Sequence, residues 1–178
     1  IADNLPATIQ ALAQAAQQAD VVMTTGGVSV GEEDHVKAAL QQIGQLDLWK
    51  VALKPGKPLA FGYIGATPFI GLPGNPQSVF VTFKVMAQQF LAYYQGQRHK
   101  VAPTLINVPL DFAVKKAQGR REYVRVRLVQ NEQGELVLNK YHNQSSGVLS
   151  SAVWADGFAL IEVGKVYEVG DRVAFWRF

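Results

Sequence analysis

Two glycine-rich segments, each lying between an apolar run and a run with helical periodicity, constrain the fold of this chain more than any other feature. Residues 24–31 read TTGGVSVG and residues 71–78 read GLPGNPQS. Glycine lets the backbone approach a ligand closely, and free N–H groups at a helix start favour an anion. In open α/β sheets, ligands bind at the carboxyl ends of the strands. The pair therefore predicts an α/β domain with one site for an anionic, phosphorylated small molecule, although either segment alone also fits a simple tight turn.

The periodicity of the first half supports this fold class. Helices are predicted at 5–19, 33–43 and 76–94, and strands at 20–25, 46–53, 59–64 and 68–72. A strand, a helix and a strand joined by short connections form a right-handed parallel unit. Helices are then expected on both faces of the sheet, which gives a three-layer α/β sandwich.

After residue 96 the pattern changes to short alternating segments separated by Gly, Asn and Asp. Strands are predicted at 105–110, 122–129, 136–139, 159–162 and 172–176. These indicate a second, all-β domain that resembles a small open barrel. We therefore predict an α/β domain over 1–98 and a β domain over 99–178. The chain begins at Ile1 without an initiator Met, so we expect it to be a piece of a longer protein.

The composition excludes several classes of protein. Hydrophobic residues make up 48% and charged residues 17%, which is typical of a packed globular chain. Cysteine is absent, so disulfides, thiolate metal sites and cysteine nucleophiles are excluded. No apolar run is long enough to span a bilayer, and no secretion signal is present. The net charge of +3 is too small to indicate a nucleic-acid partner.

Three carboxylates, Glu32, Glu33 and Asp34, follow the first glycine-rich segment. Acidic residues in a first turn complement the helix dipole, which is the simplest explanation. A carboxylate beside an anion-binding loop also repels the ligand, and a bridging Mg²⁺ would remove that repulsion. We favour Asp34 as the functional member, because one helical turn brings it back over the loop.

Lysines are concentrated between the two glycine-rich segments. Lys50 and Lys54 are four residues apart in a run predicted to be extended, so both should point to one side, and the turn at Pro55-Gly56 brings Lys57 round. Three converging ammonium groups suit a phosphate or another oxyanion. The alternative is that they are solvated lysines at the end of a strand.

In the β domain, four side chains alternate onto one face of a strand: Arg121, Tyr123, Arg125 and Arg127. This face could contact an anion or RNA, but a solvated face is the simpler interpretation for most of its members. The polar segment 143–151 offers hydroxyl donors or is an ordinary loop. The three histidines show no metal-ligand spacing.

Taken together, three motifs resemble those of the MoeA-type molybdopterin molybdenumtransferases, and also the carboxyl-terminal part of gephyrin. They are TTGGVSVG with Asp34, the segment KPGKP at 54–58, and GLPGNP with Ser78, in the order and spacing of that family. The resemblance covers the whole chain, because a small carboxyl-terminal β domain is also expected. It implies an α/β domain that is incomplete at its amino end, since family members carry an earlier strand and two further domains.

The resemblance also implies an activity. Family members insert molybdenum from molybdate into adenylylated molybdopterin and release AMP, with Mg²⁺ assisting. Asp3 and Asp34 match the acidic positions expected to hold the metal, and Lys50 and Lys54 match the anion-binding lysines; these four are the expected catalytic residues. The expected ligand-binding residues are Thr25, Gly26, Gly27, Ser29, Gly31, Lys57, Gly74, Asn75, Ser78, Arg125 and Ser146.

By the same resemblance, the protein is expected to be a cytoplasmic homodimer whose cleft is completed by the amino-terminal domain of the partner subunit. No nucleic-acid or membrane partner is expected. The nearest alternative is molybdopterin adenylylation on the same fold, which the KPGKP segment and the appended β domain disfavour. A non-catalytic, gephyrin-like scaffold is a second alternative. An RNA-binding β domain is a third, and it lacks interleaved aromatic residues beyond Tyr123.

Overall fold

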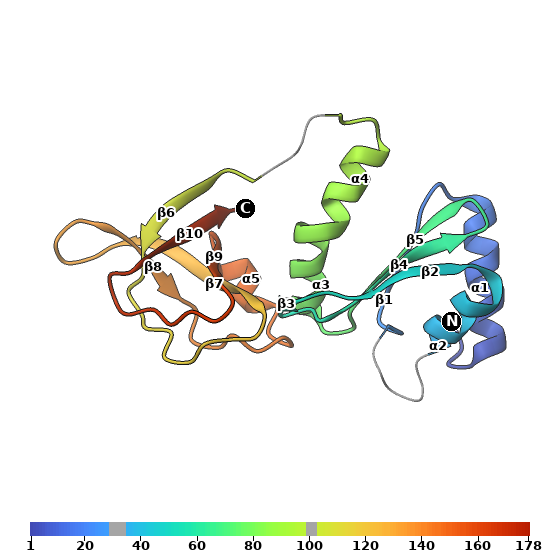
Figure 1. The fold of residues 1–178 in the computed structure, drawn as a ribbon, viewed down its shortest axis with the longest axis horizontal. Helices are drawn as coiled ribbons and strands as arrows, with labels where there is room; N and C mark the ends of the chain where they lie inside the picture. The colour runs from blue at the N-terminus through green and yellow to red at the C-terminus, as the bar shows by residue number, and fades with distance from the viewer. Residues whose placement is uncertain (29–34, 99–102) are drawn as a thin grey trace. The chain divides into compact units, whose positions relative to one another are not determined.

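The computed structural model describes residues 1–28, 35–98 and 103–178. The chain forms two compact units (Figure 1): the first contains 1–51 and 56–87, and the second contains 52–55 and 88–178. The domain limits 1–98 and 99–178 stay a prediction. In the described part of the chain, no helix combines the length and the apolar character that crossing a bilayer requires.

A mixed four-stranded sheet forms the centre of the first unit. Its strands are β1 (Val22–Thr25), β2 (Gln45–Lys50), β4 (Pro58–Ile64) and β5 (Thr67–Leu72), in the order β1-β5-β4-β2. β1 is parallel to β5, whereas β4 is antiparallel to both β5 and β2. β2 therefore runs in the same direction as β1 and β5, and all three end at one edge of the sheet.

Helices α1 (Leu5–Gln18) and α2 (His35–Ile43) pack with this sheet around one apolar cluster. Asn4 begins α1, because its Oδ1 accepts a hydrogen bond from the Ala7 N–H at 2.9 Å. The predicted α/β fold class is confirmed. The fully enclosed members of the cluster are Leu12, Val22, Val28, Ala39, Leu40, Ala60, Ile64 and Phe69.

The long helix predicted for 76–94 is present, with one π turn inside it. It consists of α3 (Pro76–Thr82), the π segment η1 (Phe83–Ala87) and α4 (Gln88–Tyr94). The Thr82 hydroxyl donates to the carbonyl of Ser78 at 2.7 Å, immediately before the π turn. A side-chain bond of this kind competes with the regular backbone ladder and bends a helix.

The single strand predicted for 46–53 is wrong. β2 ends at Lys50, and a separate short strand, β3 (Leu53–Lys54), pairs in parallel with β7 (Arg121–Gln130) of the second unit. The Val51 N–H still donates to the Lys57 carbonyl at 3.0 Å, in register with the pairing of β2 and β4, and the chain then leaves this sheet, because Leu53 pairs with Arg121 of β7. The sequence pattern had placed Lys50 and Lys54 on one face of a single strand, and this prediction is wrong because they belong to different strands.

The second unit is a curved six-stranded sheet. Its main order is β3-β7-β9-β10-β6, with β8 (Leu136–Lys140) paired to the other part of β7. The remaining strands are β6 (Leu105–Pro109), β9 (Gly157–Ile161) and β10 (Arg172–Arg177). All five predicted strands are confirmed, and among the described residues the sheet stays open rather than closing into a barrel. A short helix, α5 (Ser150–Trp154), begins at the end of the segment 143–151 and continues beyond it.

Candidate functional site

The two glycine-rich segments leave adjacent strands at the same edge of the first sheet. Thr25 ends β1 and lies opposite Leu72, which ends β5. The Gly26 N–H donates to the carbonyls of Leu72 and Pro73, at 3.0 and 3.2 Å. The start of the first loop is therefore hydrogen-bonded directly to the start of the second, so the two lie side by side.

Glycine is required in the first of these loops for conformational reasons. Gly26 and Gly27 have φ angles of 83° and 70°, which other L-residues rarely adopt. At Gly26, an added Cβ would lie 3.9 Å from the Cα of Gly74 in the second loop. The two loops thus approach each other backbone to backbone.

The second loop presents polar groups that the fold does not use. Gly74 and Asn75 are exposed, and the Asn75 side chain makes no capping bond although it begins α3. Ser78 is buried in the first turn of α3. The hydroxyl of Thr24, one residue before the end of β1, is enclosed without a hydrogen-bond partner in the part of the chain that the structure describes. These groups could bind a ligand at this edge of the sheet.

Lys50 and Lys57 lie at the same edge of the first sheet. Lys50 is the last residue of β2 and lies opposite Pro58, the first residue of β4. Lys57 directly precedes Pro58. Because neighbouring strands are about 4.8 Å apart, β2 is about 10 Å from β5. Both lysines are exposed, and within the described ranges neither ammonium group forms an ion pair. They are free to bind an anion at this edge.

Lys54, the third predicted lysine, has partners within the second unit. Its ammonium group lies 3.1 Å from Glu122 Oε1 and donates to Gln118 Oε1, also at 3.1 Å. The neighbouring Leu53 carbonyl accepts a hydrogen bond from Arg120 at 3.0 Å. These contacts fix β3 on β7, and an anion at Lys54 would have to share the ammonium group with Glu122.

The predicted acidic and metal-binding residues are only partly covered by the structure. Asp34, Ser29 and Gly31 lie outside the described residues. Asp3 is exposed, and its carboxylate lies 3.8 Å from Nε2 of His35. Among the described residues there is no group of three or more His, Asp or Glu side chains that could hold a metal ion.

Arg125 is the most unusual side chain of the second unit, because its guanidinium group is completely buried. Nε donates to Ser151 Oγ at 3.1 Å and Nη2 to the Ser145 carbonyl at 3.3 Å. Nη1 has no hydrogen-bond partner among the described residues. Burial lowers the pKa of Arg125 to about 10, and the nearby Glu122 opposes this shift. The group is still a cation at neutral pH.

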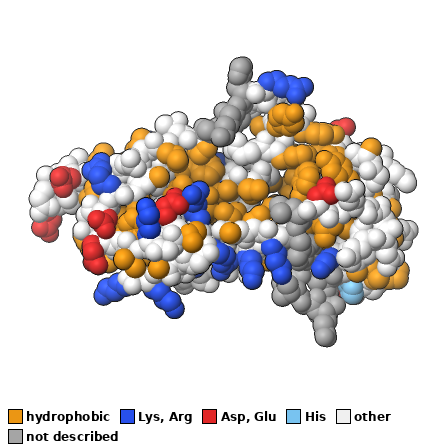
Figure 2. All heavy atoms as spheres, viewed as in Figure 1, with side chains coloured by type: hydrophobic (Ala, Val, Ile, Leu, Met, Phe, Trp, Pro, Cys, Tyr) orange, Lys and Arg blue, Asp and Glu red, His pale blue; other side chains and the backbone are white. Residues whose placement is uncertain are grey.

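The solvated face predicted for 121–127 is therefore wrong at two of its four positions, since Tyr123 and Arg125 are buried. Arg125 is bonded to Gln144, Ser145 and Ser151, and Tyr123 packs edge-on against Phe158 of β9, contacts that a local alternation pattern cannot reveal. Arg121 pairs with Glu162 at 2.8 Å, and Arg127 stacks over Trp154. On the face drawn in Figure 2, acidic and basic side chains lie close together over the unit that carries β6 to β10.

The loop between β8 and α5 encloses Arg125. It contains Ser146, which is half-buried, and Gln144, whose amide bonds to the backbone of Arg125. The hydroxyl groups of this segment were predicted as possible donors, but Gln144 and Ser151 were not predicted as partners of the arginine. Only the alternation of Arg125 with apolar neighbours was available as a signal.

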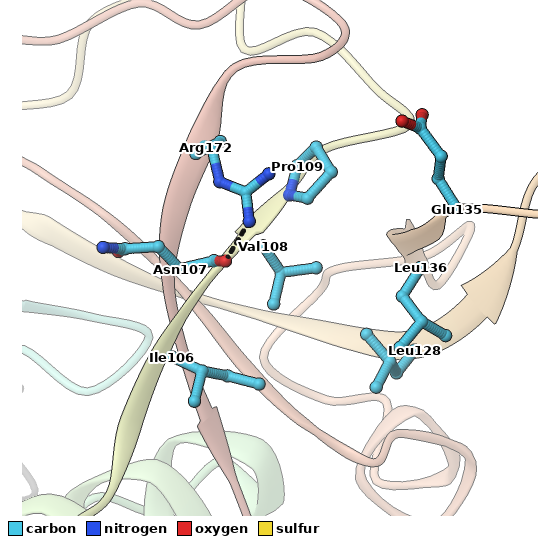
Figure 3. A pocket seen from close by; sticks show the side chains of 8 residues that line it. All are labelled: Ile106, Asn107, Val108, Pro109, Leu128, Glu135, Leu136 and Arg172. Atoms are coloured by element: carbon cyan, nitrogen blue, oxygen red, sulfur yellow. Dashed lines mark hydrogen bonds between the residues drawn. The ribbon is translucent and has the colours of Figure 1, made fainter.

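A hollow of about 360 Å³ lies elsewhere on the second unit, between β6 and β8 (Figure 3). Its wall is mostly apolar, with Leu128 and Leu136 on one side and Ile106 and Val108 on the other. Arg172 donates to the Asn107 carbonyl at 2.7 Å across its rim. None of the predicted site residues lines this hollow, so it is separate from the features described above.

The fold consists of an α/β unit, with the loop pair as its candidate ligand site, and a β-sheet unit. Residues 1–93 match the family described as "Probable molybdopterin binding domain", and residues 107–178 match the "MoeA C-terminal region (domain IV)". The chain belongs to the family of MoeA-type molybdopterin molybdenumtransferases.

Individual relatives agree with this assignment. The chain is 41% identical to the molybdopterin molybdenumtransferase of Haemophilus influenzae, over 90% of its own length and 40% of the relative. It is 36% identical to the molybdenum cofactor synthesis protein cinnamon of Drosophila melanogaster, over 88% of the chain and 26% of that protein. The structure of a MoeA protein from Pyrococcus horikoshii superposes with a TM-score of 0.74 at 26% identity, covering 98% of this chain and 41% of that one. The chain thus spans well under half of each relative.

Proposed function

We propose that this chain forms part of an enzyme that inserts molybdenum from molybdate into adenylylated molybdopterin and releases AMP. The observation that carries the proposal is the edge of the first sheet. Two glycine-rich loops joined by hydrogen bonds lie there, together with two lysines that form no ion pair among the described residues. Such an edge offers backbone N–H groups and positive charge to a phosphorylated ligand. The names of the relatives support a molybdopterin derivative as the ligand.

In this proposal, the first unit binds the phosphate and nucleotide part of the substrate. The backbone at Gly26, Gly27 and Gly74 approaches the phosphates, and Thr25, Asn75 and Ser78 supply polar side chains. Lys50 and Lys57 neutralise the charge that develops when the phosphoanhydride bond breaks and AMP leaves. Ser29, Gly31 and Asp34 complete the predicted site from outside the described residues.

We further propose a separate anion-binding group within the second unit, formed by Lys54, Arg125 and Ser146. Leaving a buried donor unsatisfied costs about 1–3 kcal/mol, so the unbonded Nη1 of Arg125 is expensive unless a ligand accepts from it. A tetrahedral oxyanion such as molybdate has the charge and the acceptor oxygens to do so. We therefore assign molybdate binding to Arg125 and Ser146. Lys54 joins them when its ammonium group exchanges Glu122 for the anion.

Mg²⁺ is retained in the proposal at Asp3 and Asp34. The described residues provide one suitable ligand group, the exposed carboxylate of Asp3, and this does not amount to a Mg²⁺ site. Because the chain spans 40% of its bacterial relative, we further propose that full activity needs the regions that the relative has in addition. We also propose that the active form is a cytoplasmic homodimer.

The test is AMP release by the intact protein that contains this chain. Purified protein is mixed with adenylylated molybdopterin, with and without molybdate, and AMP is measured by chromatography. We expect release that depends on molybdate and falls about 10- to 100-fold in Lys50→Gln, since a hydrogen bond to a charged group contributes about 1.5–3 kcal/mol. Lys165→Gln, which removes an exposed lysine of the second unit, is the matched control and should keep the wild-type rate.

Two results would contradict the proposal. AMP release that is equal with and without molybdate would contradict the proposed insertion of molybdenum. Consumption of ATP with molybdopterin as acceptor would instead identify the adenylylation reaction on the same fold.

A further inference from the structure

The side chain of Gln144 continues the sheet at the point where β8 ends. The pairing of β7 with β8 stops at Val126 opposite Lys140, so Arg125 is the first residue of β7 beyond it. There, Gln144 Oε1 accepts from the Arg125 N–H and Gln144 Nε2 donates to the Arg125 carbonyl, both at 3.0 Å. One amide therefore bonds both backbone groups of a buried strand residue, and the Arg125 carbonyl also accepts from the Tyr141 N–H at 3.2 Å.

The same amide anchors the loop that surrounds the arginine. Gln144 Nε2 also donates to the Tyr141 carbonyl at 3.0 Å, which closes the turn after β8. The next residue, Ser145, supplies the carbonyl that accepts from Nη2 of Arg125. The position of that carbonyl relative to the guanidinium group thus depends on the anchor one residue earlier.

The guanidinium group is planar and its donors form a rigid fork. When Ser151 binds Nε and Ser145 binds Nη2, the direction of Nη1 is determined as well. Nη1 is the donor that has no partner among the described residues. Whatever fixes the Ser145 carbonyl consequently fixes the direction in which the N–H groups of Nη1 are offered to a ligand.

We propose that Gln144 is a positioning residue for the Arg125 anion site. Through its three amide hydrogen bonds it holds the loop 141–151 on β7 and sets the direction in which Nη1 is offered to an oxyanion. The proposal rests on the proposed function, because it takes Arg125 to be a ligand-binding group. Gln144 itself need not touch the ligand.

The experiment uses the 178-residue chain and nuclear magnetic resonance of its arginine side chains. A guanidinium group held at Nε and Nη2 rotates slowly, so Arg125 should give separate Nη signals in the wild type. Gln144→Leu keeps the size of the side chain but removes the amide, and we expect the two Nη signals to merge. Molybdate is then titrated, and its dissociation constant should rise about tenfold in Gln144→Leu. Gln133→Leu, in the exposed turn between β7 and β8, is the matched control.

The two readouts separate this inference from the proposed function. Unchanged Nη signals and an unchanged molybdate affinity in a folded Gln144→Leu chain would overturn the positioning role. Merged Nη signals in that variant, with no molybdate response of Arg125 in the wild type, would support positioning and overturn the anion role. If Gln144→Leu does not fold, Gln144→Glu takes its place. It keeps an acceptor for the Arg125 N–H and loses both donated bonds, so its Nη signals should also merge.

Discussion

The guanidinium group of Arg125 carries an energetic cost that the β-sheet unit does not need for folding. Burial lowers the pKa of Arg125 to about 10, because the charged form is disfavoured away from water. Its two acceptors have other partners: the Ser145 carbonyl accepts from the Val148 N–H, and the Ser151 hydroxyl donates to the Val148 carbonyl. The fold would therefore lose little if the charge were removed, and we attribute its presence to ligand binding.

Replacing Arg125 with methionine tests this explanation at the scale of a single residue. Arg125→Met fills a similar volume without a charge, and replacing a buried ion by an apolar side chain is often neutral or stabilising. We expect the midpoint of thermal unfolding to stay the same or to rise, and molybdate binding to be lost. Calorimetry and a molybdate titration on the same sample measure both quantities. A large fall in the unfolding midpoint would mean that Arg125 is structural.

At the scale of loops and strands, the glycines of the second loop have different tasks. A Cβ at Gly71 would lie 2.5 Å from Val28 Cγ1 and 3.0 Å from the Cβ of Ala60, whereas at Gly74 the nearest heavy atom would be the Cα of Gly26 at 3.6 Å. Gly71 is therefore required by packing, because Val28 of the first loop lies against it. Gly74 has room for a methyl group, but that group would occupy the gap between the two loops.

The matched pair Gly71→Ala and Gly74→Ala separates these tasks. Overpacking should make Gly71→Ala less stable by about 1–3 kcal/mol. Gly74→Ala should change the free energy of unfolding by less than about 0.5 kcal/mol, while weakening the binding of AMP. Urea denaturation and an AMP titration provide the two measurements. Equal losses of stability in both variants would show that the second loop is entirely a packing element.

Local patterns predicted the elements of this chain better than their partners. The glycine-rich loops could be placed because an apolar run precedes each of them, and the five strands of the second half followed from alternation. The break after Lys50 could not be predicted, since β3 pairs with a strand near residue 121 and no neighbouring residue signals that contact. The burial of Arg125 was missed for the same reason, because the loop that covers it follows some twenty residues later.

At the scale of the whole molecule, the two units have separate hydrophobic cores. One cluster contains Phe69 and the other contains Phe175, both fully buried, and the two clusters share no residue. Regions with separate cores can open independently, because local unfolding follows the contacts within each cooperative unit. We therefore expect each core to control the stability of its own unit.

Native-state hydrogen exchange, followed by mass spectrometry, tests this expectation with one substitution in each core. Phe69→Leu and Phe175→Leu should each cost about 1–3 kcal/mol, because each leaves a small cavity at an enclosed position. Phe69→Leu should speed exchange in peptides from β4 and β5 and leave β7 and β9 at the wild-type rate. Phe175→Leu should do the reverse. If either variant speeds exchange equally in both sets of peptides, the chain unfolds as one cooperative unit, and stability could not be altered in one unit without affecting the other.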